Sequence, residues 1–205
     1  MRPSLLLATT AVCVAGVLAP SAAQASPPLD FDLQAHRGGR ALTVENMLPT
    51  FAKALEVGVG TLELDVAITR DGREVVTHDS RIDPGKCVDK GLAHPEDQQF
   101  PYAGKLVKEL TFEQVRTLDC GSITQADYPG QRSAPGAPMA TLTEVFELVR
   151  ERGAKTVAFS IELKTDPAGG DTRPARDFVD RVVSVVAQAG VHDRVKIQSF
   201  DWGAL

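Results

Sequence analysis

TLELDVAIT, residues 61–69, is an apolar stretch interrupted by two acidic side chains. Its length and its aliphatic residues predict a buried strand. Side chains alternate across a strand, so Glu63 and Asp65 project from one face and the leucines between them from the other. Burying two like charges costs several kcal/mol unless a cation or a basic partner neutralises them. The stretch therefore predicts a strand that carries a charged site.

Short apolar runs alternate with helical patterns on both sides of this stretch. The predicted strands lie at 31–35, 61–69, 74–77, 156–164 and 195–200, and the predicted helices at 46–57, 111–119, 141–153 and 174–189. Parallel strands need crossover connections, which are usually helices. The alternation predicts an α/β fold with a parallel sheet, and it fits a barrel and a doubly wound sheet equally well.

Two irregular segments interrupt the alternation. Residues 80–110 and 121–140 are rich in proline and glycine and show little periodicity. We expect them to be functional loops, the first of them an insertion. Each precedes a predicted capping box, Thr111-x-x-Gln114 and Thr141-x-x-Glu144.

Polar side chains gather where the predicted strands end. These positions hold His36 and Arg37, Glu63 and Asp65, His78 and Asp79, Glu162 and Lys164, and Gln198 and Ser199. The carboxyl ends of parallel strands open on one side of a sheet, where the active sites of β/α folds are built. We therefore expect these side chains to meet at one edge.

Three of the carboxylates predict a metal site. Glu162, in apolar surroundings, repeats on a second strand the arrangement of Glu63 and Asp65. Converging carboxylates supply the oxygen ligands that Mg²⁺ and Ca²⁺ prefer. The alternative is a buried salt-bridge network in which Arg37 and Lys164 neutralise the acids.

Two histidines share this predicted edge. His36 and His78 end strands, and imidazole exchanges protons near neutral pH, which suits general acid–base work. His94 and His192 lie in loop and helix-end contexts, where we expect surface residues.

Five motifs, taken together, resemble those of the glycerophosphodiester phosphodiesterase family. They are His36-Arg37-Gly38, Glu45-Asn46, Glu63-Leu64-Asp65-Val66, His78-Asp79 and Ile161-Glu162-Leu163-Lys164. They follow the family's order and spacing, and the resemblance spans residues 33–205. It implies a TIM (β/α)8 barrel that hydrolyses small-molecule glycerophosphodiesters to sn-glycerol 3-phosphate and an alcohol.

The resemblance also implies a role for each matched residue. Glu63, Asp65 and Glu162 match the ligands of one divalent cation, Ca²⁺ or Mg²⁺; His36 and His78 match the acid–base pair; and Arg37 and Lys164 match groups that face the phosphate. Glu45 matches the site-lining glutamate of the family's E-N-T motif, whose third position here is Met47. The insertion at 80–110 matches the region that caps the substrate pocket.

Two other functions stay open at this point. A phospholipase D-like member of the same superfamily would act on intact lipids and would need apolar, membrane-inserting loops. A non-catalytic extracellular binding module would usually have lost a metal carboxylate or a histidine. The attacking oxygen, from water or from the substrate's own glycerol hydroxyl, also stays open, as does the preferred head group.

The first 25 residues predict a signal peptide. Arg2 precedes an apolar run from Leu5 to Ala19, and Ala23-Gln24-Ala25 fits the cleavage rule. We expect a secreted, extracellular protein without stable membrane insertion after cleavage, whose phosphodiesterase domain is residues 26–205.

Two cysteines, Cys87 and Cys120, follow the predicted cleavage point. An even count in an exported protein favours a disulfide over two free thiols or part of a metal site. Removing Arg2 from the 22 basic side chains leaves 21 against 27 acidic ones, a net charge of about −6. That charge argues against nucleic-acid binding, which depends on neutralising phosphates.

The predicted strands are fewer than a TIM barrel requires. We count five, and the fold has eight, in typically about 250 residues. We therefore expect a barrel truncated after strand five. Open apolar edges would make residues 26–205 alone poorly soluble and nearly inactive.

Overall fold

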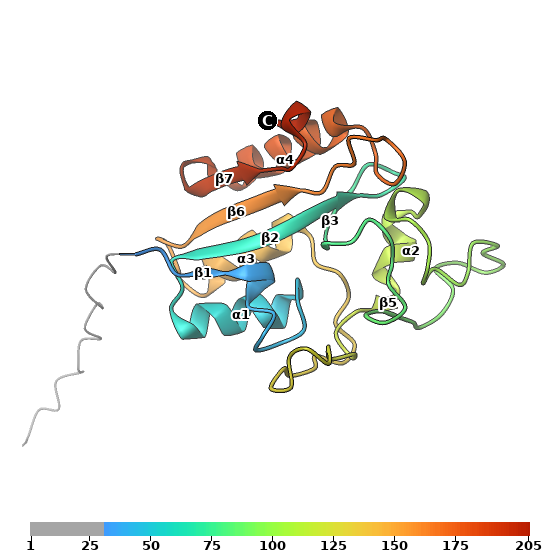
Figure 1. The fold of residues 1–205 in the computed structure, drawn as a ribbon, viewed down its shortest axis with the longest axis horizontal. Helices are drawn as coiled ribbons and strands as arrows, with labels where there is room; N and C mark the ends of the chain where they lie inside the picture. Colours follow the sequence, from blue (N-terminus) through green and yellow to red (C-terminus); the bar gives the residue numbers. More distant parts are fainter. Residues whose placement is uncertain (1–30) are drawn as a thin grey trace, which may run out of the picture. The chain divides into compact units, whose positions relative to one another are not determined.

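The computed structural model describes residues 31–205, and the predicted signal peptide at 1–25 lies outside this range. The strands and helices that position the site are shown in Figure 1. In chain order they are β1 (Gln34–Ala35), α1 (Leu48–Val57), β2 (Thr61–Ile68), β3 (Glu74–Val76), β4 (Val88–Asp89), α2 (Phe112–Arg116), β5 (Leu118–Asp119), α3 (Leu142–Glu151), β6 (Ala158–Leu163), α4 (Ala175–Ala189) and β7 (Val195–Gln198). Short 3₁₀ turns lie at His36–Gly38, Val107–Glu109, His192–Arg194 and Trp202–Ala204.

The central sheet is parallel, as predicted. Its strands run in the order β1-β2-β6-β7, and each neighbouring pair is parallel. The register places Asp65 of β2 opposite Glu162 of β6, and Glu162 opposite Gln198 of β7. Partners in a parallel register point to the same face, so the sheet itself brings these polar side chains into one row.

The third predicted strand does not belong to the parallel set. β3 pairs antiparallel with β2, with Val66 opposite Val76 and Ile68 opposite Glu74. The turn between them contains Gly72, whose φ of +76° suits glycine. A connection this short cannot form a crossover, so the two strands must form a hairpin. The prediction that His78 follows a parallel strand is therefore wrong.

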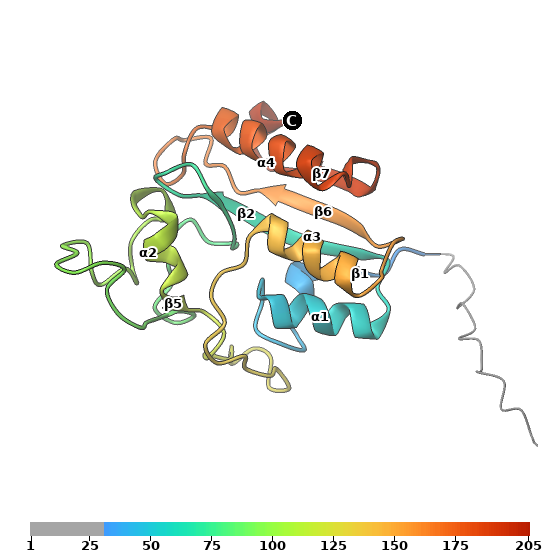
Figure 2. The ribbon, with the colours of Figure 1, turned by 180° about the vertical axis from the view of Figure 1, so that it is seen from behind.

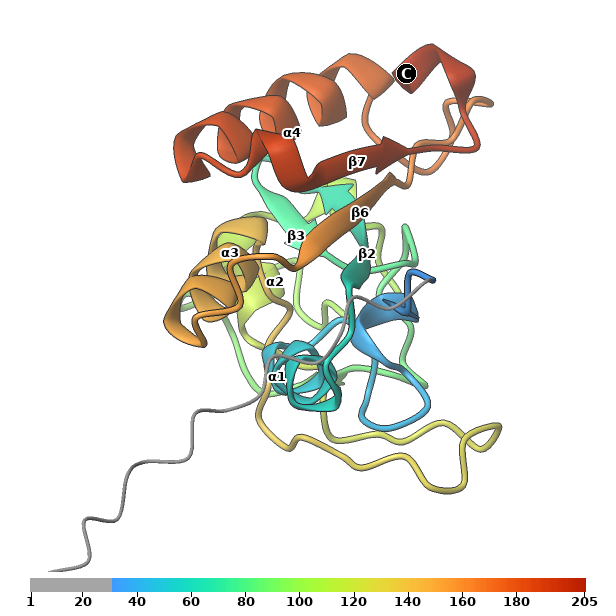
Figure 3. The same ribbon diagram turned by 90° about the vertical axis from the view of Figure 1, so that its left-hand side faces the viewer.

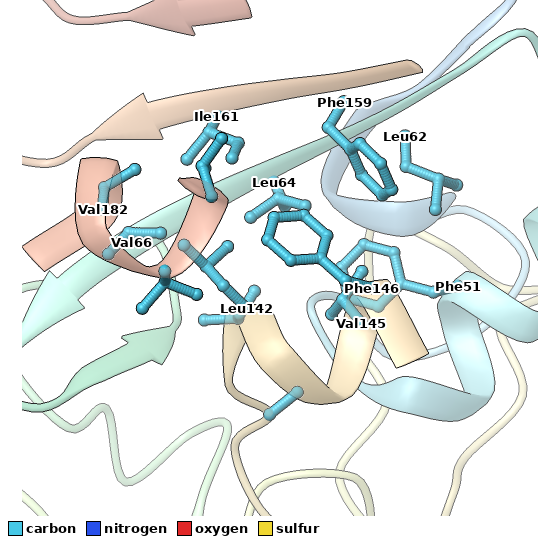
Figure 4. Packing of buried hydrophobic residues seen from close by; sticks show 14 of the residues in the cluster. Phe51, Leu62, Leu64, Val66, Leu142, Val145, Phe146, Phe159, Ile161 and Val182 are labelled. Carbon is cyan, nitrogen blue, oxygen red and sulfur yellow. The ribbon is translucent and has the colours of Figure 1, made fainter. Parts of the chain in front are cut away.

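Helices α1, α3 and α4 cover one face of the sheet. Alternate residues of β2 and β6 meet them in one apolar cluster, and Figure 4 shows Leu64 and Ile161 packed against Phe51, Phe146 and Val182. Figures 2 and 3 show these helices together on that side. The acidic side chains of β2 alternate with this cluster and face the other way. Helices on one face and charged groups on the other are typical of a barrel wall.

The insertion forms a smaller core of its own. β4 and β5 form a two-stranded antiparallel sheet, and Cys87 and Cys120 are joined by a disulfide with the two Sγ atoms 2.13 Å apart. Buried side chains of this region, Tyr102 among them, pack against Ala67 and Val75 of the hairpin. The insertion is thereby attached to the face of the sheet that carries the acids.

The helix-capping motifs predicted from the sequence are present in the structure. Both predicted capping boxes form, at Thr111 with Gln114 and at Thr141 with Glu144. The helix expected at 111–119 ends at Arg116, because the next residues pair with β4. Among the helices of residues 31–205, none has the length and apolar character needed to cross a membrane.

Candidate active site

Three carboxylates converge on the face of the sheet opposite the helices. Glu63 and Asp65 come from β2 and Glu162 from β6, and one oxygen of each lies within 4.8 Å of the others. Their residues are 7%, 1% and 8% exposed. The strand alternation and the register create this cluster, so the predicted convergence is found in the structure.

The three carboxylates differ in their charge partners. Asp65 Oδ2 lies 3.5 Å from Arg37 Nε, and Glu162 Oε1 accepts a hydrogen bond of 2.7 Å from Lys164 Nζ. Glu63 accepts from neutral groups, the backbone N–H of Arg37 at 2.6 Å and the Gln198 amide at 3.4 Å. Within residues 31–205, no basic side chain lies within ion-pair distance of Glu63.

This difference has an electrostatic consequence. Burial, followed by the neighbouring Asp65 and Glu162 carboxylates, raises the pKa of Glu63 to about 7, although the hydrogen bond from the Arg37 N–H and the more distant Arg37 charge act in the opposite direction. A carboxyl with such a pKa lacks a compensating positive charge. The salt-bridge network considered from the sequence therefore exists around Asp65 and Glu162 and leaves Glu63 out.

Arg37 is held in an unusual backbone conformation. Its φ is +50°, in the left-handed region that non-glycine residues seldom adopt. The following Gly38 is also left-handed, and a Cβ there would lie 2.9 Å from the Phe51 ring. The tight turn directs the Arg37 N–H at Glu63 and its side chain at Glu45 and Asp65. Strain of this kind persists where surrounding contacts compensate for it, often at functional sites.

Glu45 connects the site to three basic side chains. Its carboxylate lies 3.1 Å from Arg37 Nη1, 2.9 Å from Arg40 Nε and 3.0 Å from Lys86 Nζ. Burial alone would raise the pKa of Glu45, but Lys86, Arg37 and Arg40 together hold it below its ordinary value. Glu45 is thus an ionised, buried centre of the network, in keeping with its predicted place beside the site.

The next residue, Asn46, contacts the acidic cluster directly. Its Nδ2 donates to Asp65 Oδ2 at 3.1 Å. Its Oδ1 is buried and has no hydrogen-bond partner within the described residues. Buried acceptors without a partner are uncommon in proteins and suggest an unseen ion or water.

The two predicted acid–base histidines both adjoin the cluster. His36 is exposed and immediately precedes Arg37, which contacts Glu63. Partial burial, then Arg37 and Arg40, lower the pKa of His36. His78 follows the short strand β3, and the N–H of the preceding Thr77 donates to the backbone oxygen of Asp65, so the hairpin ends level with the acids.

His78 forms a close pair with the next residue. Its Nδ1 lies 2.8 Å from Asp79 Oδ1, and Asp79 Oδ2 accepts from Lys86 Nζ at 2.6 Å. The His78 hydrogen bond, with Lys86 and against the effect of burial, holds the pKa of Asp79 far below its ordinary value. The sequence interpretation named His78 and Asp79 but missed Lys86, which carries no periodic or motif signal inside the insertion.

The remaining predicted positions lie as expected. Lys164 follows β6, contacts Glu162 and lies 5.9 Å from the centre of the Phe200 ring. His94 and His192 are both exposed; His94 lies in the insertion beside Asp97, and His192 lies beside Asp193.

All of these site residues fall in a segment that matches a known family. Residues 36–205 match the model of the glycerophosphoryl diester phosphodiesterase family. The glycerophosphodiester phosphodiesterase of Caldanaerobacter subterraneus subsp. tengcongensis is 30% identical over 167 residues, which are 82% of this chain and 57% of that protein. This chain spans about half the length of the curated relatives that it matches.

Solved structures show the same architecture. A Silicibacter pomeroyi protein, provisionally named a glycerophosphoryl diester phosphodiesterase, matches with a TM-score of 0.73 and 31% identity over 85% of this chain and 59% of that one. A phosphodiesterase from Oleispira antarctica, solved with its product sn-glycerol-3-phosphate, matches with a TM-score of 0.61 and 22% identity over 85% of this chain and 59% of its own, and shares the fold. The fold is therefore the predicted α/β architecture of the phosphodiesterase TIM-barrel type.

Proposed function

This chain belongs to the glycerophosphoryl diester phosphodiesterase family, and we propose that its site hydrolyses glycerophosphodiesters to sn-glycerol 3-phosphate and an alcohol. The observation that carries the proposal is the uncompensated Glu63 within the cluster of three carboxylates. Two basic side chains lie within ion-pair distance of two of the acids, and the third has no such partner among residues 31–205. A divalent cation would supply the missing positive charge, and it would also stabilise the negative charge that develops during phosphodiester hydrolysis.

The donor set fits a hard divalent cation such as Ca²⁺ or Mg²⁺. Glu63, Asp65 and Glu162 offer carboxylate oxygens within 4.8 Å of one another, and such ions take oxygen ligands from carboxylates and amide carbonyls. The unpartnered Oδ1 of Asn46 is one more oxygen beside Asp65. When bound, the cation polarises a phosphoryl oxygen and offsets the charge that develops in the transition state.

Two basic residues, Arg37 and Lys164, would bind the phosphate group. A phosphodiester anion repels an attacking oxygen until its own charge is offset, and Arg37 and Lys164 provide cations at the rim of the acidic cluster. In the described structure Arg37 pairs with Glu45 and Asp65, and Lys164 pairs with Glu162. These contacts hold both side chains beside the cluster, where they would bind the phosphate group of the substrate.

The two histidines move the protons. One imidazole nitrogen accepts the proton of the attacking oxygen, and the other histidine donates a proton to the leaving alkoxide, so that charge does not accumulate on either oxygen. His78 presents Nε2 for this work, because its Nδ1 contacts Asp79. An attacking water gives sn-glycerol 3-phosphate directly, whereas the neighbouring glycerol hydroxyl gives a cyclic phosphate that water then opens.

A substrate panel tests the proposal. The purified protein with a complete barrel is incubated with glycerophosphocholine, glycerophosphoethanolamine, a glycerophosphate polymer and lysophosphatidylcholine, each with Ca²⁺, Mg²⁺ or EDTA. We expect glycerol 3-phosphate from the deacylated substrates with a cation present, and none with Glu162→Gln. Release of choline from lysophosphatidylcholine alone would favour the phospholipase D-like alternative, and cation binding without any turnover would favour a binding module.

We also propose that the protein acts outside the cytoplasm. The signal-like residues 1–25 and the disulfide between Cys87 and Cys120 support export, because disulfides persist in oxidising compartments. Fractionation of the producing cells with an antibody to the protein tests this. Retention of uncleaved protein in the cytoplasm would contradict it.

A further inference from the structure

Lys86 lies in the insertion and contacts Asp79, the residue that pairs with His78. Its Nζ lies 2.6 Å from Asp79 Oδ2 and 3.0 Å from Glu45 Oε1, and its side chain is only 22% exposed. Two carboxylates thus occupy the ammonium group.

Asp79 connects Lys86 to His78 through its two carboxylate oxygens. Oδ2 accepts from Lys86, and Oδ1 lies 2.8 Å from Nδ1 of His78. A carboxylate at Nδ1 keeps the ring proton on that nitrogen and leaves Nε2 as the basic nitrogen. Fixing Asp79 therefore fixes both the tautomer and the orientation of His78.

The backbone around Lys86 is firmly anchored. The N–H groups of Lys86 and Cys87 both donate to the Asp83 carbonyl oxygen at 2.9 Å, and Gly85 N–H donates to Asp83 Oδ1 at 2.7 Å. Cys87 is bonded to Cys120, the residue that follows β5. A closed turn and a covalent crosslink thus hold the lysine in place from the insertion side.

Glu45 and Asp79 would lose different shares of their positive partners if Lys86 were removed. Glu45 keeps Arg37 and Arg40 as basic partners if Lys86 is removed. Asp79 would keep only His78. Loss of Lys86 therefore acts mainly on Asp79, and through Asp79 on His78.

We infer that Lys86 is a positioning residue for His78: it acts through Asp79 to hold the imidazole with its proton on Nδ1 and with Nε2 available for proton transfer. The expected effect on kcat rests on the proposed function. The expected effect on the tautomer of His78 can be measured without any turnover. The inference also gives the insertion a role in positioning His78.

The tautomer of His78 gives a readout that does not need activity. The full chain is labelled with ¹⁵N-histidine, and the ring nitrogen signals are compared at alkaline pH for wild type, Lys86→Met and Lys90→Met. Lys90 is exposed in the same insertion and serves as the matched control. We expect the Nδ1–H tautomer to dominate in wild type and Lys90→Met, and a mixture in Lys86→Met. An unchanged tautomer in folded Lys86→Met would overturn the inference.

Kinetics test the route through Asp79. We expect Lys86→Met to lower kcat about 10- to 100-fold, the order expected when a reacting group is misplaced by about 1 Å, and Lys90→Met to leave it unchanged. In an Asp79→Asn background the further loss from Lys86→Met should vanish, because the two residues act in series. A full additional loss in that background would contradict the inference, as would a rise in KM at unchanged kcat. Failure of wild type to turn over any substrate refutes the proposed function and leaves the tautomer result to decide the role of Lys86.

Discussion

Glu63 should make the metal-free protein less stable as the pH rises through the neutral range. Its pKa of about 7 in the folded state exceeds the ordinary value of 4.5. Between these pH values the folded state binds more protons than the unfolded state, so the free energy of unfolding falls with rising pH. At about 1.4 kcal/mol per pKa unit, the loss amounts to at most about 3.5 kcal/mol.

The contributions of Glu45, Asp79 and His36 to the pH dependence of stability can be separated from that of Glu63. The pKa values of Glu45 and Asp79 are lowered, so their contributions to stability are lost only as the solution becomes more acidic than about pH 4.5. The lowered pKa of His36 makes stability rise with pH, below about 6.5, and thus acts against Glu63. His36 is present in wild type and in a Glu63→Gln variant alike, and the difference between the two proteins isolates Glu63.

Urea unfolding in EDTA at pH 5, 6, 7 and 8 measures this difference. We expect wild type to lose stability relative to Glu63→Gln across that range, whereas Glu147→Gln, an exposed control, follows wild type. Adding Ca²⁺ or Mg²⁺ at pH 8 should restore the stability of wild type more than that of Glu63→Gln, because a ligand stabilises the state that binds it. Parallel stability curves for wild type and Glu63→Gln would refute the account of Glu63 as an uncompensated buried acid.

Three further outcomes follow from the site and the insertion. Calorimetric titration should show that Glu162→Gln binds a divalent cation more weakly than wild type, and full activity of this variant or of wild type in EDTA would contradict the metal site. His36→Ala and His78→Ala should each lower the rate about 10²- to 10⁴-fold and remove one limb of the pH profile, whereas near-normal turnover over pH 5–9 would make the histidine structural. Mass spectrometry of the non-reduced protein should find the peptides of Cys87 and Cys120 linked, and their replacement by serine should cost about 3–4 kcal/mol for a crosslink across 33 residues; two alkylatable thiols would contradict the crosslink.

The acidic cluster could be predicted because its cause is local. The period-two alternation of β2 fixes Glu63 and Asp65 on one face, whatever the strand pairs with. Glu162 could be assigned to a second strand by the same pattern. The register that sets Glu162 opposite Asp65 is a property of two strands packed together on α3 and α4. The residue pattern of one strand alone does not predict which residue of another strand lies opposite.

The error at β3 and the omission of Lys86 have different physical origins. The turn containing Asp71 and Gly72 lies between two apolar runs, a pattern that indicates a hairpin. The connection is also too short for the crossover that a parallel pair needs, so β3 could have been recognised from the sequence as antiparallel. Lys86 lies in an aperiodic insertion and reaches Glu45 across 41 residues of sequence. Contacts of that kind come from tertiary folding, and neither hydrophobic period nor motif spacing indicates them.

The most direct test of the central claim is cation-dependent product release. The protein with a complete barrel is purified, stripped with EDTA, mixed with glycerophosphocholine, and supplied with Ca²⁺ or Mg²⁺ while free glycerol 3-phosphate is measured. The account predicts no release before the cation, release after it, and no recovery in Glu63→Gln under the same conditions. Equal release with and without the cation, or none in either case, would contradict it.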